Sequence, residues 1–126
     1  MPKVSRQTTP EVVDAGPFED RIAHLAGYTV NFTSIREDGD LAALLVGLPD
    51  DRCQCPHWGY VFSGRLTFTY PDGVDVIEAG EAYYIPPGHT PAASAGTEFL
   101  MISPQEEMAR TEAVMQQNLE RMQAGA

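Results

Sequence analysis

The chain has 126 residues, 43% of them hydrophobic, which suffices for one domain with a single core that needs no disulfide or metal to hold it together. Eight Lys and Arg residues against 18 Asp and Glu residues give a formal net charge of -10, so the chain repels nucleic-acid phosphates and anionic lipid surfaces. We therefore expect no nucleic-acid and no membrane partner. The N-terminal segment has no apolar signal region, and no stretch approaches the roughly 20 apolar residues that a membrane span needs, so we expect a cytoplasmic protein.

Residues 1–27 combine prolines, threonines and charges with little periodicity. They are expected to form an N-terminal arm that becomes ordered by packing on the rest of the domain or on a partner. From Tyr28 to Ser34 the chain is β-branched and aromatic, with apolar residues at alternate positions, which predicts a half-buried strand. The continuous apolar run from Leu41 to Leu48 lies between turn residues, and its short length favours a buried strand over a helix.

A β-hairpin is predicted around the turn sequence Pro71-Asp72-Gly73, because Gly adopts positive φ at low cost and Pro presets its own φ. Its two strands are residues 65–70 and 74–77. Further strands are expected at residues 82–85 and 97–102, separated from their neighbours by Gly and Pro breaks. Many short strands between such breaks predict an all-β, antiparallel sandwich or barrel over residues 28–103.

The periodicity changes at the C-terminal end, where residues 104–126 are predicted to form an amphipathic helix. Ser103 is expected at the N-cap, Pro104 at the first helical position and Glu106 at the capping-box position. One face of this helix carries methionines and a leucine, which are expected to pack on the barrel or on a second subunit. We therefore expect a homodimer. The apolar face consists of Met108, Met115, Leu119 and Met122.

Two segments, His57-Trp-Gly-Tyr-Val-Phe-Ser-Gly64 and Gly80-Glu-Ala-Tyr-Tyr-Ile-Pro-Pro-Gly88, resemble the two motifs of the cupin superfamily. The resemblance covers residues 40–103 and implies a jelly-roll β-barrel. Many cupins hold a divalent metal in the barrel through three histidines and a glutamate. Within the superfamily, the chain more closely resembles a sub-group of small, single-domain bacterial cupins with a His-x-Gly-Tyr-Val and Pro-Pro-Gly-His pair, and this resemblance implies no particular reaction.

The usual set of four cupin ligands is rearranged in this chain. Aligning the first motif on its Tyr-Val pair places His57 where the family has its glutamate, and Cys53 and Cys55 near the usual pair of histidines. In the second motif, Pro91 occupies the usual histidine position, whereas His89 directly follows the last glycine.

Four side chains are therefore candidate metal ligands: His57, His89, Cys53 and Cys55. Imidazole is the commonest protein ligand of transition metals. Two cysteines one residue apart are poorly placed for a disulfide, but they share one face if the strand is regular, and with the histidines they make a Cys2His2 set that favours zinc. The divalent metal is expected to be zinc or iron. The alternative is a pair of core histidines bonded to backbone carbonyls and thiols that are simply buried.

Aromatic side chains near the motifs are candidates for the wall of a ligand pocket. We assign Tyr60, Tyr83 and Trp58 to it, because tyrosine and tryptophan offer an apolar body with a polar tip, although Trp58 equally suits the core. Alternation along a strand allows only one of Tyr83 and Tyr84 to point inward. His24 is expected to be a surface or packing residue.

These features support two hypotheses about function. The first is a metal-dependent enzyme acting on a small organic molecule, as a dioxygenase, isomerase or lyase. The second is a non-catalytic module that senses or binds a small ligand or a metal. An open metal site that accepts a small carboxylate favours the enzyme, and a dry or four-ligand site favours the module. The sequence has no phosphate-binding loop and no serine-hydrolase elbow.

Overall fold

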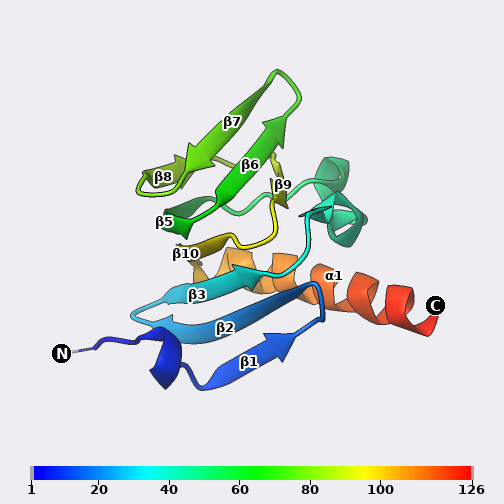
Figure 1. Cartoon of the computed structure of the whole chain (residues 1–126). Coiled ribbons are helices and arrows are strands. Elements are labelled where there is room, and N and C mark those ends of the chain that lie inside the picture. Colours follow the sequence, from blue (N-terminus) through cyan, green and yellow to red (C-terminus); the bar gives the residue numbers. More distant parts are fainter. Residues whose placement is uncertain (1, 126) are drawn as a thin grey trace.

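The computed structural model describes residues 2–125, whose strands form two antiparallel sheets that share one core (Figure 1). The larger sheet has six strands in the order β1-β2-β3-β10-β5-β8, and the smaller has four in the order β4-β9-β6-β7. The larger sheet contains β1 (Glu11–Asp14), β2 (Phe18–Leu25), β3 (Tyr28–Ile35), β10 (Glu98–Pro104), β5 (His57–Ser63) and β8 (Ala82–Ile85). The smaller contains β4 (Gly39–Asp40), β9 (Thr90–Ala93), β6 (Arg65–Tyr70) and β7 (Gly73–Glu78).

One long helix, α1 (Gln105–Ala124), follows the last strand and packs against β3 and β10 (Figure 1). Three short 3-10 helices complete the described chain: η1 (Arg6–Thr8), η2 (Leu41–Leu45) and η3 (Pro49–Asp51). Helix η2 packs against α1. Within the described residues, no helix is both long enough and apolar enough to span a lipid bilayer.

The all-β prediction is confirmed, and so is the hairpin, in which β6 pairs with β7 around the Pro71-Asp72-Gly73 turn. Among the described residues, no strand pairing joins the two sheets. The predicted barrel is therefore not closed, and the strands form a sandwich of two sheets. The core between them draws on both sheets, with β3, β5, β8 and β10 on one side and β6 on the other. Its fully buried members are Ile35, Val61, Leu66, Phe68, Tyr83, Ile85 and Phe99.

The structure differs from the expectations in three places. Residues 11–25, within the expected arm, form β1 and β2, which extend the larger sheet. Residues 41–45, expected as a strand, form η2, whose first turn is capped by the Asp40 side chain accepting from the Ala42 amide. The N-cap of α1 is Pro104, one residue later than expected, because Ser103 still belongs to β10 and its side chain bonds to His57.

Candidate metal centre and cavity

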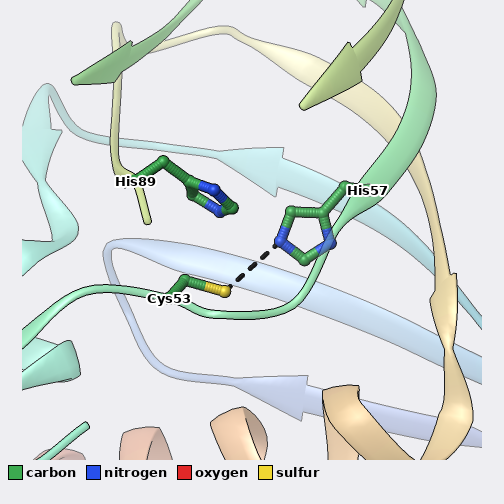
Figure 2. Close-up of side chains that lie close together, drawn as sticks. All are labelled: Cys53, His57 and His89. Atoms are coloured by element: carbon green, nitrogen blue, oxygen red, sulfur yellow. Dashed lines mark hydrogen bonds between the residues drawn. The ribbon is translucent and has the colours of Figure 1, made fainter. Parts of the chain in front are cut away.

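Three metal-ligating side chains meet between the two sheets: Cys53, His57 and His89 (Figure 2). Each offers one ligand atom, and these atoms lie within 4.8 Å of one another. All three residues are buried, with no more than 3% of their surface exposed. Cys53 lies in the loop before β5, His57 is the first residue of β5, and His89 lies in the turn before β9. The three side chains come together only because the fold brings these segments side by side.

Backbone hydrogen bonds hold Cys53 beside the turn that carries His89. The Cys53 amide donates to the His89 carbonyl at 2.9 Å, and the Gly88 amide donates to the Cys53 carbonyl at 2.8 Å. Gly88 has a φ of 95°, a left-handed conformation that favours glycine, and so the Pro-Pro-Gly-His sequence turns sharply here. His57 opens β5, and its side chain points toward the same space from the larger sheet (Figure 2).

Hydrogen bonds orient both imidazole rings, and that of His89 leaves its Nε2 available as a ligand atom. His89 Nδ1 lies 2.8 Å from the Pro86 carbonyl oxygen, which can only accept, so Nδ1 carries the proton and Nε2 keeps its lone pair. His57 Nδ1 lies 2.7 Å from Ser103 Oγ, and its Nε2 lies 3.4 Å from Cys53 Sγ. Such outer bonds are the usual device that fixes a metal-binding histidine.

Burial keeps the two rings neutral. It lowers the pKa of His57 to about 3, with the neighbouring His89 contributing, and it also lowers the pKa of His89. Burial raises the pKa of the Cys53 thiol, which donates a weak bond toward the Cys55 carbonyl and lies 3.7 Å from Thr111 Oγ1. A neutral imidazole is the form that binds metals, whereas a thiol must lose its proton, which a bound cation promotes.

The cluster borders a cavity of about 370 Å³ between the sheets and α1. Most of its wall is apolar. Prominent among these wall residues are Leu45, Leu66, Phe68, Phe99, Met101 and Met108.

The same cavity carries acidic side chains that our sequence analysis missed: Glu11, Asp20 and Glu112. Burial raises the pKa of Asp20 to about 6 and that of Glu112 to about 7. The one sequence signal was the alternation Phe18-Glu-Asp-Arg-Ile22, in which Asp20 takes an inward position between two apolar residues.

Of the four predicted ligands, Cys55 lies outside the cluster. Its thiol is buried 3.4 Å from the Pro56 carbonyl, and burial raises its pKa to about 12. The three aromatic residues assigned to a ligand pocket lie away from the cavity wall. Trp58 is 44% exposed beside Tyr84, Tyr60 is 38% exposed, and Tyr83 is a core residue whose hydroxyl donates to the Leu100 carbonyl at 3.1 Å.

Comparison with solved structures identifies the architecture. An RmlC-like cupin from Shewanella frigidimarina superposes with a TM-score of 0.54 at 15% identity, covering 80% of this chain and 88% of that one. The chain has the cupin fold. A protein of unknown function from Rhizobium leguminosarum gives 0.58 at 17% identity, covering 82% and 95% of the two chains. The polyketide cyclase RemF from Streptomyces resistomycificus gives 0.54 at 18% identity, covering 82% and 79%.

No protein-family model matches the chain, and a search of curated proteins also finds no match. The expected cupin architecture is thus confirmed at the level of the fold. Membership of the sub-group with the Pro-Pro-Gly-His signature stays a prediction.

Proposed function

We propose that this protein binds a zinc ion through Cys53, His57 and His89 and uses it to act on a small organic molecule held in the adjoining cavity. The observation that carries the proposal is the convergence of these three buried donors on one side of a largely apolar cavity. Of the two hypotheses raised by the sequence, this arrangement favours the enzyme.

The donor set suits zinc better than the harder divalent metals. One thiolate and two imidazoles are ligands that zinc prefers, whereas magnesium and manganese prefer oxygen. Around a tetrahedral zinc ion, ligand atoms lie about 3.4–3.6 Å apart. Cys53 Sγ and His57 Nε2 are already 3.4 Å apart, and the spread of 4.8 Å across all three donors needs only small side-chain rotations to close.

Three protein ligands leave a fourth position for a substrate or water, as in catalytic zinc sites. Cys55, which would have closed a four-ligand structural site, lies outside the cluster. A zinc ion bound here would supply a Lewis acid able to polarise a substrate oxygen or to lower the pKa of a water molecule. The protein's own part is to hold both imidazoles neutral and oriented, and to surround the reacting groups with largely apolar walls.

Zinc uptake tests the proposal directly. Chelator-treated wild-type protein should take up one zinc ion per chain, and a thousandfold excess of zinc over Kd should raise Tm by about 10 °C or more. His57→Ala and His89→Ala should each abolish both effects. A His24→Ala variant is the matched control, because His24 is exposed on β2. Wild-type protein that neither retains zinc nor gains thermal stability from it would contradict the proposal.

Cobalt separates the enzyme from the binding module. The visible spectrum of the cobalt-substituted protein should change when acetate is added, because acetate would enter the open fourth position. A spectrum that stays unchanged at saturating acetate would favour a closed site and the non-catalytic module.

Ser103 is expected to act on the metal through His57. Ser103→Ala removes the hydroxyl 2.7 Å from His57 Nδ1 and should weaken zinc binding by about tenfold, as the loss of such outer bonds usually does. Competition with a chromogenic chelator measures this change. Ser63→Ala is the control, since Ser63 bonds only to the Gly96 carbonyl at the surface, and an equal loss in both variants would contradict the role.

The homodimer and the cytoplasmic location stay predictions. The surface best suited to a second copy is the outer face of β5 and β8, where four large aromatic side chains are exposed, since aromatic residues are enriched at protein interfaces. They are Trp58, Tyr60, Phe62 and Tyr84.

A further inference from the structure

A second cavity adjoins the cavity at the metal centre. It has a volume of about 450 Å³ and lies between the β1–β2 turn, the loop before β4, η2 and the C-terminal end of α1. We call it the outer cavity, because Glu37, Asp38 and Met122 in its wall are exposed, and we call the cavity at the metal centre the inner cavity. The two adjoin along six shared wall residues: Phe18, Ile35, Leu41, Leu44, Ala93 and Leu119.

One face of α1 runs along both cavities. Met108, Thr111 and Met115 line the inner cavity, Leu119 lines both, and Met122 lines the outer one. Residues three or four apart lie on the same side of a helix, so these five form one continuous wall. The flexible methionine side chains of this face suit a wall that adapts to an apolar ligand.

The helix also measures the length of the combined space. Thr111 marks the metal end, because its Oγ1 lies 3.7 Å from Cys53 Sγ, and Met122 marks the outer end. Eleven residues of helix separate them, which at 1.5 Å per residue amounts to about 16 Å. An extended chain advances roughly 1.2 Å per bond, so a molecule about a dozen bonds long spans both cavities.

The charges on the two walls restrict the end groups that a ligand can carry. Among the described residues, no Lys or Arg lines either cavity, whereas six carboxylic side chains do. An anionic group would be repelled there, and a bound metal would be its only positive partner. The carboxylic side chains are Glu11, Asp20 and Glu112 in the inner cavity and Glu37, Asp38 and Asp40 in the outer cavity.

We propose that the two cavities together bind an elongated, apolar molecule without an anionic group, whose oxygen-bearing end reaches Cys53, His57 and His89 and whose other end lies beside Met122. A long-chain alcohol or ketone has this chemistry. The inference deepens the proposed function by naming the substrate class, and it rests on that function in taking the metal centre as the place where the molecule reacts. Leu119, at the boundary between the cavities, is thereby a specificity-determining residue for chain length.

Two alcohols of different length test the inference. Each buried methylene raises affinity about fourfold, so 1-dodecanol should bind wild-type protein at least about 100-fold more tightly than 1-hexanol, both as purified and after chelator treatment. Leu119→Trp places a bulky ring at the boundary and should lower this ratio below about tenfold, with the affinity for 1-hexanol changed by less than about threefold. Met122→Glu places a charge beside the far end of the chain and should also lower the ratio. Gln117→Trp is the control, because Gln117 is exposed on α1 and lines neither cavity.

Two further measurements test the charge and the position of the oxygen. Dodecanoate, an anion with a chain of the same length, should bind chelator-treated protein at least about tenfold more weakly than 1-dodecanol. In the cobalt-substituted protein, 1-dodecanol should change the visible spectrum, because its oxygen reaches the metal. Equilibrium dialysis gives the affinities.

Four results would each overturn the inference: equal binding of the two alcohols by wild-type protein, a full ratio in both Leu119→Trp and Met122→Glu, equal binding of dodecanoate and 1-dodecanol, or a cobalt spectrum that bound 1-dodecanol leaves unchanged. Met122 is 46% exposed, so Met122→Glu is expected to fold, and the Tm of each variant checks this. Because the affinities of chelator-treated protein do not involve zinc, a failure to bind zinc overturns the proposed function while the preferences for length and charge are judged separately.

Discussion

The Gly59→Ala substitution is expected to destabilise the protein by about 3 kcal/mol or more, as overpacking against immovable neighbours does. Gly59 lies in β5 opposite Tyr83 of β8 and Met101 of β10. A methyl group there would overlap the Leu100 carbonyl oxygen and the ring end of Tyr83. The Tyr83 hydroxyl donates to that same carbonyl oxygen, so the ring cannot move aside without breaking a buried hydrogen bond.

The clash is costly because its partners are a strand backbone and a core side chain. Relief would require β5 to move away from β8 or β10, and β5 begins with His57, so the metal centre would move with it. Urea unfolding gives the loss of stability. Gly73→Ala is the control, because its methyl group meets no atom within 4 Å and its φ is not in the left-handed region, so we expect about 0.5 kcal/mol or less. Equal stabilities of the two variants would refute the packing argument.

The fold was predictable where local chemistry alone determines the backbone. The hairpin forms where it was predicted, but its two-residue turn is Pro71-Asp72, and Gly73 opens β7 without the positive φ that the prediction invoked. The residues after 104 follow an amphipathic helical pattern that is visible in the sequence alone. The stretch from Leu41 to Leu45 was not predictable, because a short apolar run fits a buried strand and a buried turn of helix equally well. The Asp40 side chain, which caps that turn, decides in favour of the helix.

Strand β2 was not predicted from the sequence because it contains Asp20, one of the acidic residues that line the cavity. A charged side chain at an inward position breaks the apolar alternation by which a strand is recognised. Asp20 occupies such a position, and only the donors on β3, Asn31 and Thr33, make its burial tolerable. Those donors are 11 and 13 residues away in sequence, so no local pattern reveals them.

The candidate site was predictable in its histidines and less so in its other members. His57 begins the first segment that the resemblance singled out, His89 directly follows the second, and the fold brings them together with ring centroids 4.9 Å apart. The aromatic residues follow from alternation: once His57 points inward, Trp58 and Tyr60 point outward. The two cysteines were expected to share a face, but they precede β5 in a loop, where the two-residue period does not apply.

That difference between the two cysteines leads to a large expected difference in metal affinity between two otherwise similar variants. Cys53→Ser should weaken zinc binding by about 100-fold or more, because it replaces a thiolate ligand with a hydroxyl that stays protonated at neutral pH. Cys55→Ser should change zinc affinity by less than about threefold, since its sulfur lies outside the cluster and a serine hydroxyl can still donate to the Pro56 carbonyl.

The pair of variants is well matched, because both thiols are buried within the same small apolar cluster beside Met108, so a general effect of placing a hydroxyl there would appear in both. Competition with a chelator gives the affinities, and the thiolate-to-metal absorption band of the cobalt-substituted protein reports the ligand itself. That band should vanish in Cys53→Ser and persist in Cys55→Ser. If instead the band persists in Cys53→Ser, or vanishes in both variants, Cys55 takes part in binding the metal and the proposed three-ligand site is wrong.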